Sequence, residues 1–520
     1  MYNLAMVLED SARTVPDRPA LVLGGTSLTY AQVAAAANRV AHLLVSFGVE
    51  PGDRVALSCP NLPQFPIVYY GILKAGAVVV PLNVLNKSRE VTYFLDDAEV
   101  SVVLAFEGSE ELPIGRFAVE GAKAAARPPQ VVLLTADPQA ESPYEGVPTL
   151  ARAVAELPDR FETVQRRETD TAVVLYTSGT TGQPKGAELS HSNQVMNALT
   201  CNRLFGSQPG EDTHLVALPL FHTFGATVNL TAGFSMGATL VLLPRFEPRQ
   251  ALELLLAHRV TVFAGVPTMW WALLRLLTDG EAEVGGLAEH LRLGISGGSA
   301  LPVEILRGVQ DTLGISIMEG YGLSETSPVA SFSRADRPRP GSIGLPVWGV
   351  EMGIIDPADP DWARLEDPEA IGEIVVRGHN IMTGYLRRPE ETAAAIRDGW
   401  FRTGDLGRRD EEGFYYVVDR SKDMIVRGGY NVYPREVEEV LLTHEQVSLV
   451  AVVGVPHESL GEEIKAHVIL EQGATITPEQ LRDWAKEQMA DYKYPREIVI
   501  DEALPMTSTG KILKRELREA

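Results

Sequence analysis

The sequence predicts an α/β protein with more than one domain. Short apolar runs, of the kind that a parallel sheet buries on both faces, alternate with segments of helical periodicity over much of the chain. After about Gly341 the pattern changes to runs typical of antiparallel strands, and near Ser421 a mixed helix and strand pattern begins. The chain has 520 residues, more than one hydrophobic core usually supports. We therefore expect a parallel α/β part, a β-rich part and a small α+β part.

The first predicted helix has a recognisable start and end. Thr29 and Gln32 are spaced as a capping box, and apolar residues then recur at helical spacing from Val33 to Leu44. Gly48 ends this pattern. We expect a helix that begins after Thr29 and ends before Gly48.

Short apolar runs predict the strands of the parallel part, at residues 55–58, 77–80, 102–104, 131–134, 239–243, 260–264 and 293–295. Residues 373–376 and 414–418 predict antiparallel strands, with a turn at Glu412 and Gly413. In the last part, helices over 434–442 and 478–488 flank strands over 449–455 and 464–470. The polar stretch 136–147 predicts a surface loop.

Composition limits the classes of partner. The net charge of -23 argues against nucleic acid or an anionic membrane surface as a general partner. The N-terminus lacks the apolar core of a secretory signal, and the apolar stretch 67–85 is broken by Lys74 and Pro81, so no integral membrane segment is expected. Cys59 and Cys201 have no metal-ligand spacing and fit a reducing compartment, most simply as buried small hydrophobes. We expect a cytoplasmic protein.

The segment YTSGTTGQPKG at residues 176–186 is the most informative in the chain. Its glycines let the backbone approach a ligand, while its hydroxyls and one lysine suit phosphate oxygens. The candidate phosphate-binding residues are Thr177, Ser178, Gly179, Thr180, Thr181, Gly182 and Lys185. A buried strand is expected before this loop and a helix after it, from about Ser192, so that the loop could offer N–H groups to phosphate. Gly186 stands where a P-loop has Ser or Thr for magnesium, which argues against a kinase or GTPase.

Further motifs follow in a fixed order: PLFHTFG at 219–225, SGGSA at 296–300, EGYGLSET at 319–326, TGD at 403–405, DRSKDMIVRGGYNVYPREVE at 419–438 and PMTSTGKILKR at 505–515. Together with the glycine-rich loop they resemble the adenylate-forming superfamily of acyl-CoA synthetases, nonribosomal-peptide adenylation domains and luciferases. The resemblance spans essentially the whole chain. It implies a large N-terminal domain over residues 1–419, a small mobile C-terminal domain over 420–520, and a hinge near Lys422.

The resemblance also implies a reaction, in which ATP and a carboxylic acid form an acyl adenylate that coenzyme A then consumes. The glycine-rich loop would hold the β- and γ-phosphates, Ser324 would donate to the α-phosphate, and Glu325 with Thr177 would bind Mg²⁺. No cysteine in these motifs is placed as a nucleophile, so the thiol is expected from outside. The chain ends soon after Lys511, which leaves no room for a fused carrier domain and favours coenzyme A.

The nucleotide would meet residues from four of these motifs. Predicted contacts beyond the phosphate loop are Gly297, Gly298, Ser299, Glu319, Gly320, Tyr321, Ser324, Asp405 and Arg420. The SGGSA segment would form a wall of the adenine slot, and Tyr321 would offer a face for stacking. Asp405 suits a ribose diol, because one carboxylate accepts from both hydroxyls, and Arg420 would approach the ribose or the phosphates.

Two further residues complete the implied catalytic set with Glu325. By resemblance, His222 lines the junction of the acyl and nucleotide sites, where it gates or orients the carboxylate. Lys511 would be the mobile lysine that bridges the carboxylate and the α-phosphate. After rotation about Lys422, the turn at Gly428 and Gly429 would border the channel for the thiol.

The acid itself is less firmly indicated than the reaction. Resemblance to bacterial fatty acid ligases, and the lack of a recognisable cationic motif for a second carboxylate, favour a medium- or long-chain fatty acid. Aryl or short-chain acids, and a stand-alone ligase that loads a separate carrier protein, stay open. A phosphotransferase and a non-catalytic nucleotide-binding module are the alternatives from other classes. The oligomeric state is also open, and a homodimer is compatible with the resemblance.

Overall fold

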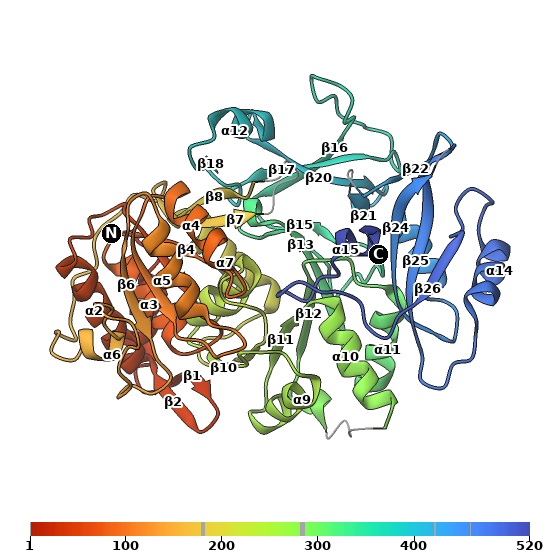
Figure 1. Ribbon diagram of the computed structural model, residues 1–520. Helices are drawn as coiled ribbons and strands as arrows, with labels where there is room; N and C mark the ends of the chain where they lie inside the picture. Colours follow the sequence, from red (N-terminus) through yellow and green to blue (C-terminus); the bar gives the residue numbers. More distant parts are fainter. Residues whose placement is uncertain (1, 178–182, 281–285, 421–422, 458, 520) are drawn as a thin grey trace.

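The structure is a computed structural model that describes residues 2–177, 183–280, 286–420, 423–457 and 459–519 (Figure 1). Four sheets organise these residues. A seven-stranded and a nine-stranded sheet, both with parallel centres, form the larger part of the molecule, and two five-stranded, mainly antiparallel sheets follow along the chain. The mixed α/β class and the later antiparallel strands are therefore confirmed.

The seven-stranded sheet carries the start of the phosphate loop. Its strands are, in spatial order, β18 (Gly384–Tyr385), β8 (Lys185–Ser190), β7 (Thr171–Thr177), β4 (Val78–Pro81), β3 (Arg54–Ser58), β5 (Val100–Phe106) and β6 (Gln130–Leu134). The associated helices are α2 (Tyr30–Ser46), α3 (Gln64–Lys74), α4 (Ser88–Asp97), α5 (Ile114–Ala124) and α6 (Leu150–Ala153). Pairing is parallel from β7 to β6, as predicted from the buried apolar runs.

The nine-stranded sheet carries two of the glycine-rich motifs. Its order is β15 (Leu345–Pro346), β14 (Val329–Phe332), β13 (Ile317–Gly322), β12 (Leu293–Gly297), β11 (Val262–Gly265), β9 (Thr213–Val216), β10 (Thr239–Leu242), β1 (Pro19–Leu23) and β2 (Thr26–Thr29). The helical elements of this region are α1 (Met6–Thr14), α7 (His191–Phe205), η1 (Phe224–Thr231), α8 (Ala232–Ser235), α9 (Pro248–Ala257), α10 (Pro267–Thr278), η2 (Leu287–Glu289), α11 (Val303–Leu313) and η3 (Ser324–Thr326).

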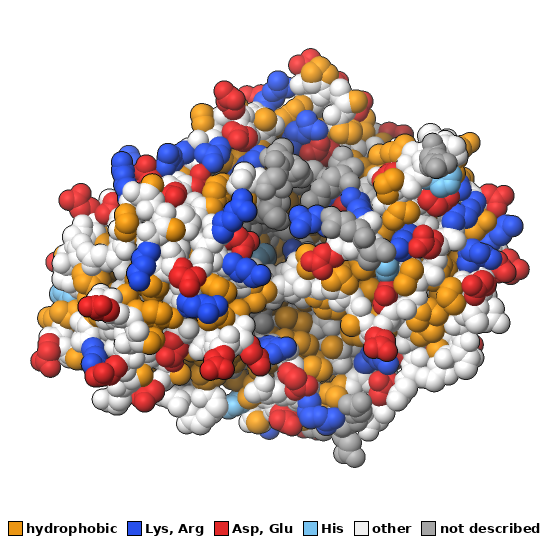
Figure 2. Space-filling view, in the orientation of Figure 1, with side chains coloured by type: hydrophobic (Ala, Val, Ile, Leu, Met, Phe, Trp, Pro, Cys, Tyr) orange, Lys and Arg blue, Asp and Glu red, His pale blue; other side chains and the backbone are white. Residues whose placement is uncertain are grey.

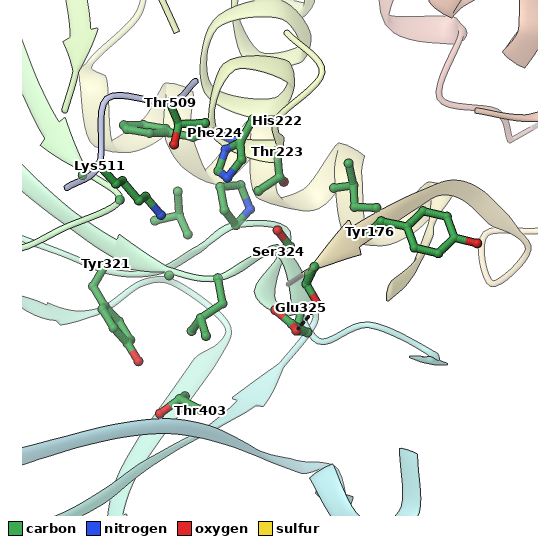
Figure 3. A pocket seen from close by; sticks show the side chains of 18 of the residues that line it. Tyr176, His222, Thr223, Phe224, Tyr321, Ser324, Glu325, Thr403, Thr509 and Lys511 are labelled. Carbon is green, nitrogen blue, oxygen red and sulfur yellow. Dashed lines mark hydrogen bonds between the residues drawn. The ribbon is translucent and has the colours of Figure 1, made fainter. Parts of the chain in front are cut away.

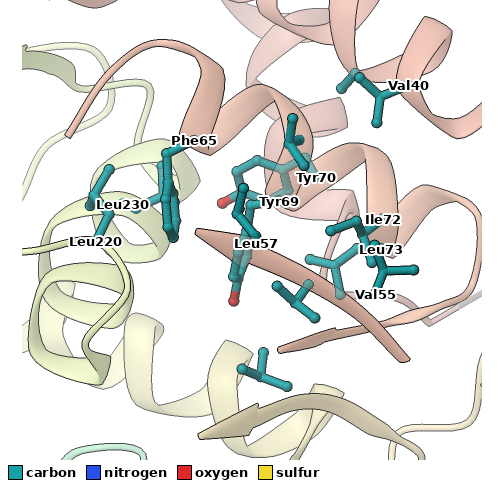
Figure 4. Packing of buried hydrophobic residues seen from close by; sticks show 14 of the residues in the cluster. Val40, Val55, Leu57, Phe65, Tyr69, Tyr70, Ile72, Leu73, Leu220 and Leu230 are labelled. Atoms are coloured by element: carbon teal, nitrogen blue, oxygen red, sulfur yellow. The ribbon is translucent and has the colours of Figure 1, made fainter. Parts of the chain in front are cut away.

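Helix α3 fills the space between the two large sheets. Its side chains Phe65, Tyr69 and Tyr70 are fully buried, and they belong to one apolar cluster with Leu57 of β3 and Leu230 of η1 (Figure 4). A helix that is apolar on all sides is stable only when it is covered on all sides. The packing of α3 therefore fixes one sheet against the other, and with it the cavity between them.

Helix α2 confirms the predicted capping box. The Thr29 hydroxyl accepts a hydrogen bond from the backbone N–H of Gln32, whose side chain accepts from the backbone N–H of Thr29. The helix ends at Ser46, close to the predicted stop at Gly48.

The helix predicted from about Ser192 is confirmed as α7, but a strand that was not predicted separates it from the phosphate loop. Strand β8 follows the loop and pairs antiparallel with β7, with Val173 opposite Leu189 and Leu175 opposite Ala187. Helix α7 begins only at His191, capped by Ser190. The phosphate loop thus connects two antiparallel strands, β7 and β8. The cause is that Ala187 and Leu189 alternate with polar residues at the period of a strand, and both are fully buried.

The third sheet contains β16 (Val350–Ile355), β17 (Gly372–Gly378), β20 (Trp400–Arg409), β19 (Ile396–Arg397) and β21 (Tyr415–Arg420), beside helix α12 (Pro389–Ala395). The register of β20 and β21 places Asp405 opposite Arg420. Two predicted binding residues therefore meet through strand pairing.

The fourth sheet contains β23 (Tyr430–Val432), β22 (Ile425–Arg427), β25 (Gly461–Leu470), β24 (Val447–His457) and β26 (Glu497–Ile500), with helices α13 (Pro434–Leu441), α14 (Pro478–Gln488) and α15 (Lys514–Glu519). It forms the blue part of Figure 1. The indole N–H of Trp271 in α10 donates to the hydroxyl of Ser448 in β24 over 3.0 Å, which joins this part to the larger one. A small C-terminal domain is confirmed, while the boundary between residues 419 and 420 stays a prediction.

Several local expectations are also confirmed. Residues 136–147 form no helix or strand, and Cys59 and Cys201 are buried free thiols. In the part of the chain that the structure describes, no helix combines the length and apolar character needed to span a membrane.

Candidate active site

A cavity of about 1060 Å³ opens between the large sheets, the third sheet and the loop near the end of the chain (Figure 3). The predicted site residues that line it are Thr177, Lys185, His222, Gly297, Gly298, Gly320, Tyr321, Ser324, Glu325, Asp405, Arg420 and Lys511. They come from motifs spread over more than half of the sequence. The fold therefore brings most of the predicted site to one place.

Glu325 forms one corner of the cavity. Its Oε1 atom lies 3.3 Å from the Thr177 hydroxyl and accepts a hydrogen bond of 3.0 Å from the Tyr385 hydroxyl. Burial raises the pKa of Tyr385, and the negative Glu325 raises it further, so this hydroxyl stays a donor. The Lys185 ammonium lies 5.2 Å from the centre of the same tyrosine ring. Thus a cation, a carboxylate and two hydroxyls lie at the described end of the phosphate loop.

Asp405 forms a second polar group. The Tyr321 hydroxyl donates to its Oδ2 atom over 2.7 Å, and the Arg420 Nε lies 3.1 Å from its Oδ1 atom. Burial raises the pKa of Asp405 above its usual value, while Arg420 opposes that shift. Asp405 in turn raises the pKa of Arg420. This carboxylate is buried yet paired, with acceptor capacity left for a ligand hydroxyl.

Lys511 reaches the cavity from the last loop of the chain. Burial is the main cause that lowers its pKa to about 8, and repulsion from Arg420 adds to the effect. The pKa of His222 is lowered to about 3, first by burial and then by Lys511. The His222 Nδ1 atom accepts from the backbone N–H of Phe224 over 3.3 Å. Figure 3 shows the Lys511 amino group pointing into the space between His222 and Tyr321. Because its pKa is about 3, the His222 imidazole is neutral at physiological pH.

Two glycines keep this region open. A Cβ atom on Gly297 would lie 3.1 Å from the Gly320 carbonyl oxygen and from the Phe224 ring. On Gly298, where φ is +83°, it would lie 3.2 Å from Cε of Lys511. A side chain at either position would narrow the slot in which a flat ligand could lie against backbone.

The other end of the cavity is apolar. Members of a single buried cluster line it there: Cys201, Phe205, Phe224, Val228, Ile295, Val329 and Phe332, with the partly buried Leu204 packed against them. The rings of Phe205 and Phe332 pack with their centres 5.8 Å apart. The cavity therefore joins a charged region to a hydrophobic one, as a ligand with an ionised head and an apolar body requires.

Comparison with known proteins matches this arrangement. Residues 8–386 match the family described as AMP-binding enzyme, and residues 436–511 match its C-terminal domain. The chain belongs to the AMP-binding enzyme family. A long-chain-fatty-acid--CoA ligase of Bacillus subtilis (strain 168) is 38% identical, with 99% of this chain and 94% of that protein aligned. A feruloyl-CoA synthase of Amycolatopsis sp is 35% identical, over 98% and 96% of the two chains.

Solved structures agree. The crystal structure of ATP-bound MatB from Rhodopseudomonas palustris has a TM-score of 0.88 and 35% identity, over 100% of this chain and 99% of that one. These matches identify the present chain as an AMP-binding acid–CoA ligase. ATP and coenzyme A are substrates of this class, and the reaction proceeds through an acyl adenylate.

Some predicted site residues of the ligase lie away from the cavity. Ser299 is exposed, and Gly428 and Gly429 form the exposed turn between β22 and β23. Glu319 is buried, and its Oε1 atom accepts from the backbone N–H of Leu301 over 3.3 Å. Burial raises its pKa to about 7. None of these residues is among the described lining of the cavity. Their predicted roles stay predictions, as do those of Ser178, Gly179, Thr180, Thr181, Gly182 and Lys422, which fall outside the described residues.

Several residues that line the ligase cavity were not among the site residues predicted from the sequence. Tyr385, Thr403, Asn83 and Ser508 all contribute to it. Tyr385 follows Gly384 in the short strand β18, which pairs with β8. No local pattern marks Tyr385 as a partner of Glu325, because strand pairing alone brings them together.

The described residues hold no cluster of three or more His, Cys, Asp or Glu side chains suited to a metal ion. Such a cage is not needed for Mg²⁺ bound to a nucleotide, because this ion is commonly held by one or two carboxylates together with phosphates and water. Glu325 and Thr177 offer two hard oxygen ligands at one corner. These residues fit that kind of ion.

Proposed function

We propose that the ligase activates a medium- or long-chain fatty acid to its acyl-CoA, with release of AMP and pyrophosphate. The observation that carries this proposal is the division of the cavity. Charged residues gather at one end, and the other end is lined by the apolar cluster around Phe205 and Phe332. An aliphatic chain along this wall would bury apolar surface, and such burial contributes about 25 cal/mol of favourable free energy per Å². The similarity to a long-chain-fatty-acid--CoA ligase at 38% identity supports the same substrate class.

The first half-reaction joins the acid to the nucleotide. A carboxylate oxygen attacks the α-phosphorus, the bond to the bridging oxygen breaks, and pyrophosphate leaves. The protein forms no covalent bond to the substrates in this step, so it accelerates the reaction by aligning them and neutralising charge. The Lys511 ammonium bridges the carboxylate and the α-phosphate. His222, neutral because of its low pKa, borders the carboxylate without adding charge.

The nucleotide is held by residues at the polar end. Lys185 and the phosphate loop bind the β- and γ-phosphates, and Ser324 donates to the α-phosphate. Asp405 accepts from the ribose hydroxyls, and Arg420 lowers the pKa of that carboxyl against the effect of burial. Tyr321 and the strip formed by Gly297 and Gly298 border the base. Figure 2 shows Lys and Arg side chains around the hollow in the middle of this face, although the net charge is -23.

Mg²⁺ is the metal that these donors suit, with Glu325 and Thr177 as the protein ligands. When bound, it neutralises phosphate charge and orients the triphosphate. The hydrogen bond from Tyr385 fixes the rotamer of Glu325 for this role.

In the second half-reaction the thiolate of coenzyme A attacks the acyl carbon. The bond between this carbon and the phosphate oxygen breaks, and AMP leaves with that oxygen. The small domain rotates about Lys422 between the two steps, so that Lys511 leaves the cavity. The exposed turn at Gly428 and Gly429 then borders the path of the thiol. Location in the cytoplasm and assembly as a homodimer stay predictions of the sequence.

Two competing substrates have their own support. A feruloyl-CoA synthase at 35% identity makes an aryl acid the nearest alternative. A ligase that loads a carrier protein would form the adenylate but would not consume it with coenzyme A.

A pyrophosphate–ATP exchange assay with acids of graded length separates these functions. Acetate, octanoate, dodecanoate, hexadecanoate, benzoate and ferulate are offered with Mg²⁺, and consumption of the acyl adenylate is then followed with and without coenzyme A. We expect exchange to peak with a medium or long aliphatic acid, and its adenylate to be consumed only when coenzyme A is present. A peak with ferulate or benzoate would transfer the proposal to aryl acids. Exchange without coenzyme A-dependent consumption would favour carrier loading.

A further inference from the structure

The loop that carries Lys511 is closed on itself. The backbone N–H of Thr507 donates to the Lys511 carbonyl over 2.7 Å, and that of Gly510 donates to the Thr507 carbonyl over 2.9 Å. The backbone N–H of Lys511 donates to the Thr507 hydroxyl over 3.0 Å. Met506 and Ile512 form a bridge across the base of the loop. Lys511 therefore moves with its loop as one unit, and contacts of the loop determine where its ammonium lies.

One contact of this loop comes from the seven-stranded sheet. Asn83, which follows β4, donates from Nδ2 to the Ser508 hydroxyl over 2.8 Å. Its Oδ1 atom accepts from the backbone N–H of Leu85 over 3.1 Å. The second bond orients the side-chain amide, so that its N–H group faces Ser508.

A second contact comes from helix α10, which follows β11 of the nine-stranded sheet. The hydroxyl of Thr268, at the start of α10, donates to the Gly510 carbonyl over 2.6 Å. Gly510 has φ of +76°, and a Cβ atom there would lie 2.8 Å from Val266 and 3.1 Å from the Thr268 hydroxyl. The turn of the loop thus lies directly against the first turn of α10.

We propose that Asn83 and Thr268 are positioning residues for the first half-reaction, acting through Ser508 and Gly510 on Lys511. The inference rests on the proposed function, in which Lys511 serves adenylate formation. The two contacts reach the loop from different parts of the fold, the segment after β4 and the start of α10, so together they restrict both its approach and its rotation. Small displacements of an aligned group reduce the rate steeply, because a catalytic donor acts only from the correct position.

The contacts exist only when the small domain is docked as it is in this structure. They should therefore matter for adenylate formation and not for thioester formation, during which Lys511 has left the cavity. A neutral hydrogen bond contributes about 0.5–1.5 kcal/mol, so loss of one contact should slow adenylation about threefold to tenfold.

The test compares both half-reactions in single and double variants. Asn83→Ala, Ser508→Ala and the double variant are assayed by pyrophosphate–ATP exchange with dodecanoate, and separately for thioester formation from supplied dodecanoyl adenylate and coenzyme A. We expect each single variant to lower the kcat of exchange about threefold to tenfold, with no further loss in the double variant, because both changes remove the same bond. Thioester formation should be unchanged.

Thr268 offers an independent arm with a conservative rescue. Thr268→Val keeps the shape and loses the hydroxyl, so exchange should fall by a similar factor, whereas Thr268→Ser should restore it. Asn38→Ala and Thr278→Val are matched controls. Asn38 donates to the Asp159 carbonyl over 2.8 Å, and Thr278 donates to the Arg275 carbonyl over 3.2 Å, both away from the cavity lining.

Three results would overturn the inference. They are equal loss in both half-reactions, additive losses in the Asn83 and Ser508 pair, and a rise in the KM for ATP with kcat unchanged. Thermal unfolding of each variant distinguishes these outcomes from a folding defect. If the unmodified enzyme catalyses exchange with no acid at all, the proposed function itself fails. That outcome is read from the unmodified enzyme alone and does not depend on the variants.

Discussion

The Cε atom of Lys511 lies 3.2 Å from the point that a Cβ atom would occupy on Gly298. A residue from the last loop of the chain is thus in close contact with backbone that follows β12 of the nine-stranded sheet. A Cβ atom at this distance would be closer than an ordinary contact, so the lysine side chain would have to shift if residue 298 carried a side chain.

Gly298→Ala should therefore impair adenylation. The methyl group would push Lys511 from its place, and alanine at φ +83° adds strain of about 1–2 kcal/mol. We expect a drop in the kcat of pyrophosphate–ATP exchange of tenfold or more. Gly473→Ala is the matched control, since Gly473 has φ of +80° and a Cβ atom added there would meet nothing within 4 Å. If both variants lose activity equally, strain alone explains the effect and crowding of Lys511 does not.

The pH dependence of adenylation should show an alkaline limb. The pKa of Lys511 in the fold is about 8, so the ammonium is present below that pH and is lost as pH rises through it. We expect kcat/KM for exchange, which reports the free enzyme, to decline above about pH 8. His222, with a pKa of about 3, should add no inflection between pH 5 and 8. Lys511→Arg should retain a low rate without the alkaline limb, because guanidinium stays protonated. A limb that persists in this variant would assign it to another group.

Removing the Tyr385 hydroxyl should weaken the response to Mg²⁺. Tyr385→Phe keeps the ring beside Lys185 but removes the donor to Glu325, so the carboxylate is less firmly oriented. Hydrogen bonds to charged groups contribute about 1.5–3 kcal/mol, and we expect the half-saturating Mg²⁺ concentration to rise about tenfold or more. A titration of exchange rate against Mg²⁺ measures this. Tyr416→Phe, which loses a hydroxyl 3.1 Å from Asp410 outside the cavity lining, should leave the titration unchanged.

Two opposite changes in the apolar wall should shift acid preference in opposite directions. Val228→Phe places a ring in the cavity, so longer acids should lose kcat/KM relative to octanoate. Phe205→Ala opens space and should favour longer acids, with a loss of stability of about 3–5 kcal/mol that thermal unfolding will show. The ratio of kcat/KM for hexadecanoate to that for octanoate is the measurement. If the two variants give the same ratio, the acyl chain does not lie along this wall.

The sequence by itself determined the class of fold and most of the chemistry. Motifs such as the loop at 176–186 or the segment around Lys511 are local, and their residue types alone restrict what they can bind. Capping and periodicity are local too, so α2 and α14 were predicted with nearly correct bounds. Such signals need no knowledge of distant contacts.

Only the tertiary structure decided which side chains meet. Asn83 and Ser508 are 425 residues apart, and Tyr385 reaches Glu325 only because β18 pairs with β8. Glu319 is the neighbour of Gly320, which lines the cavity, yet the Glu319 carboxylate accepts from the backbone N–H of Leu301 and is not among the described lining. Side-chain direction in a strand alternates with every residue, so pairing and register assign each residue to the site or away from it. That choice depends on packing across the whole chain, which no local pattern encodes.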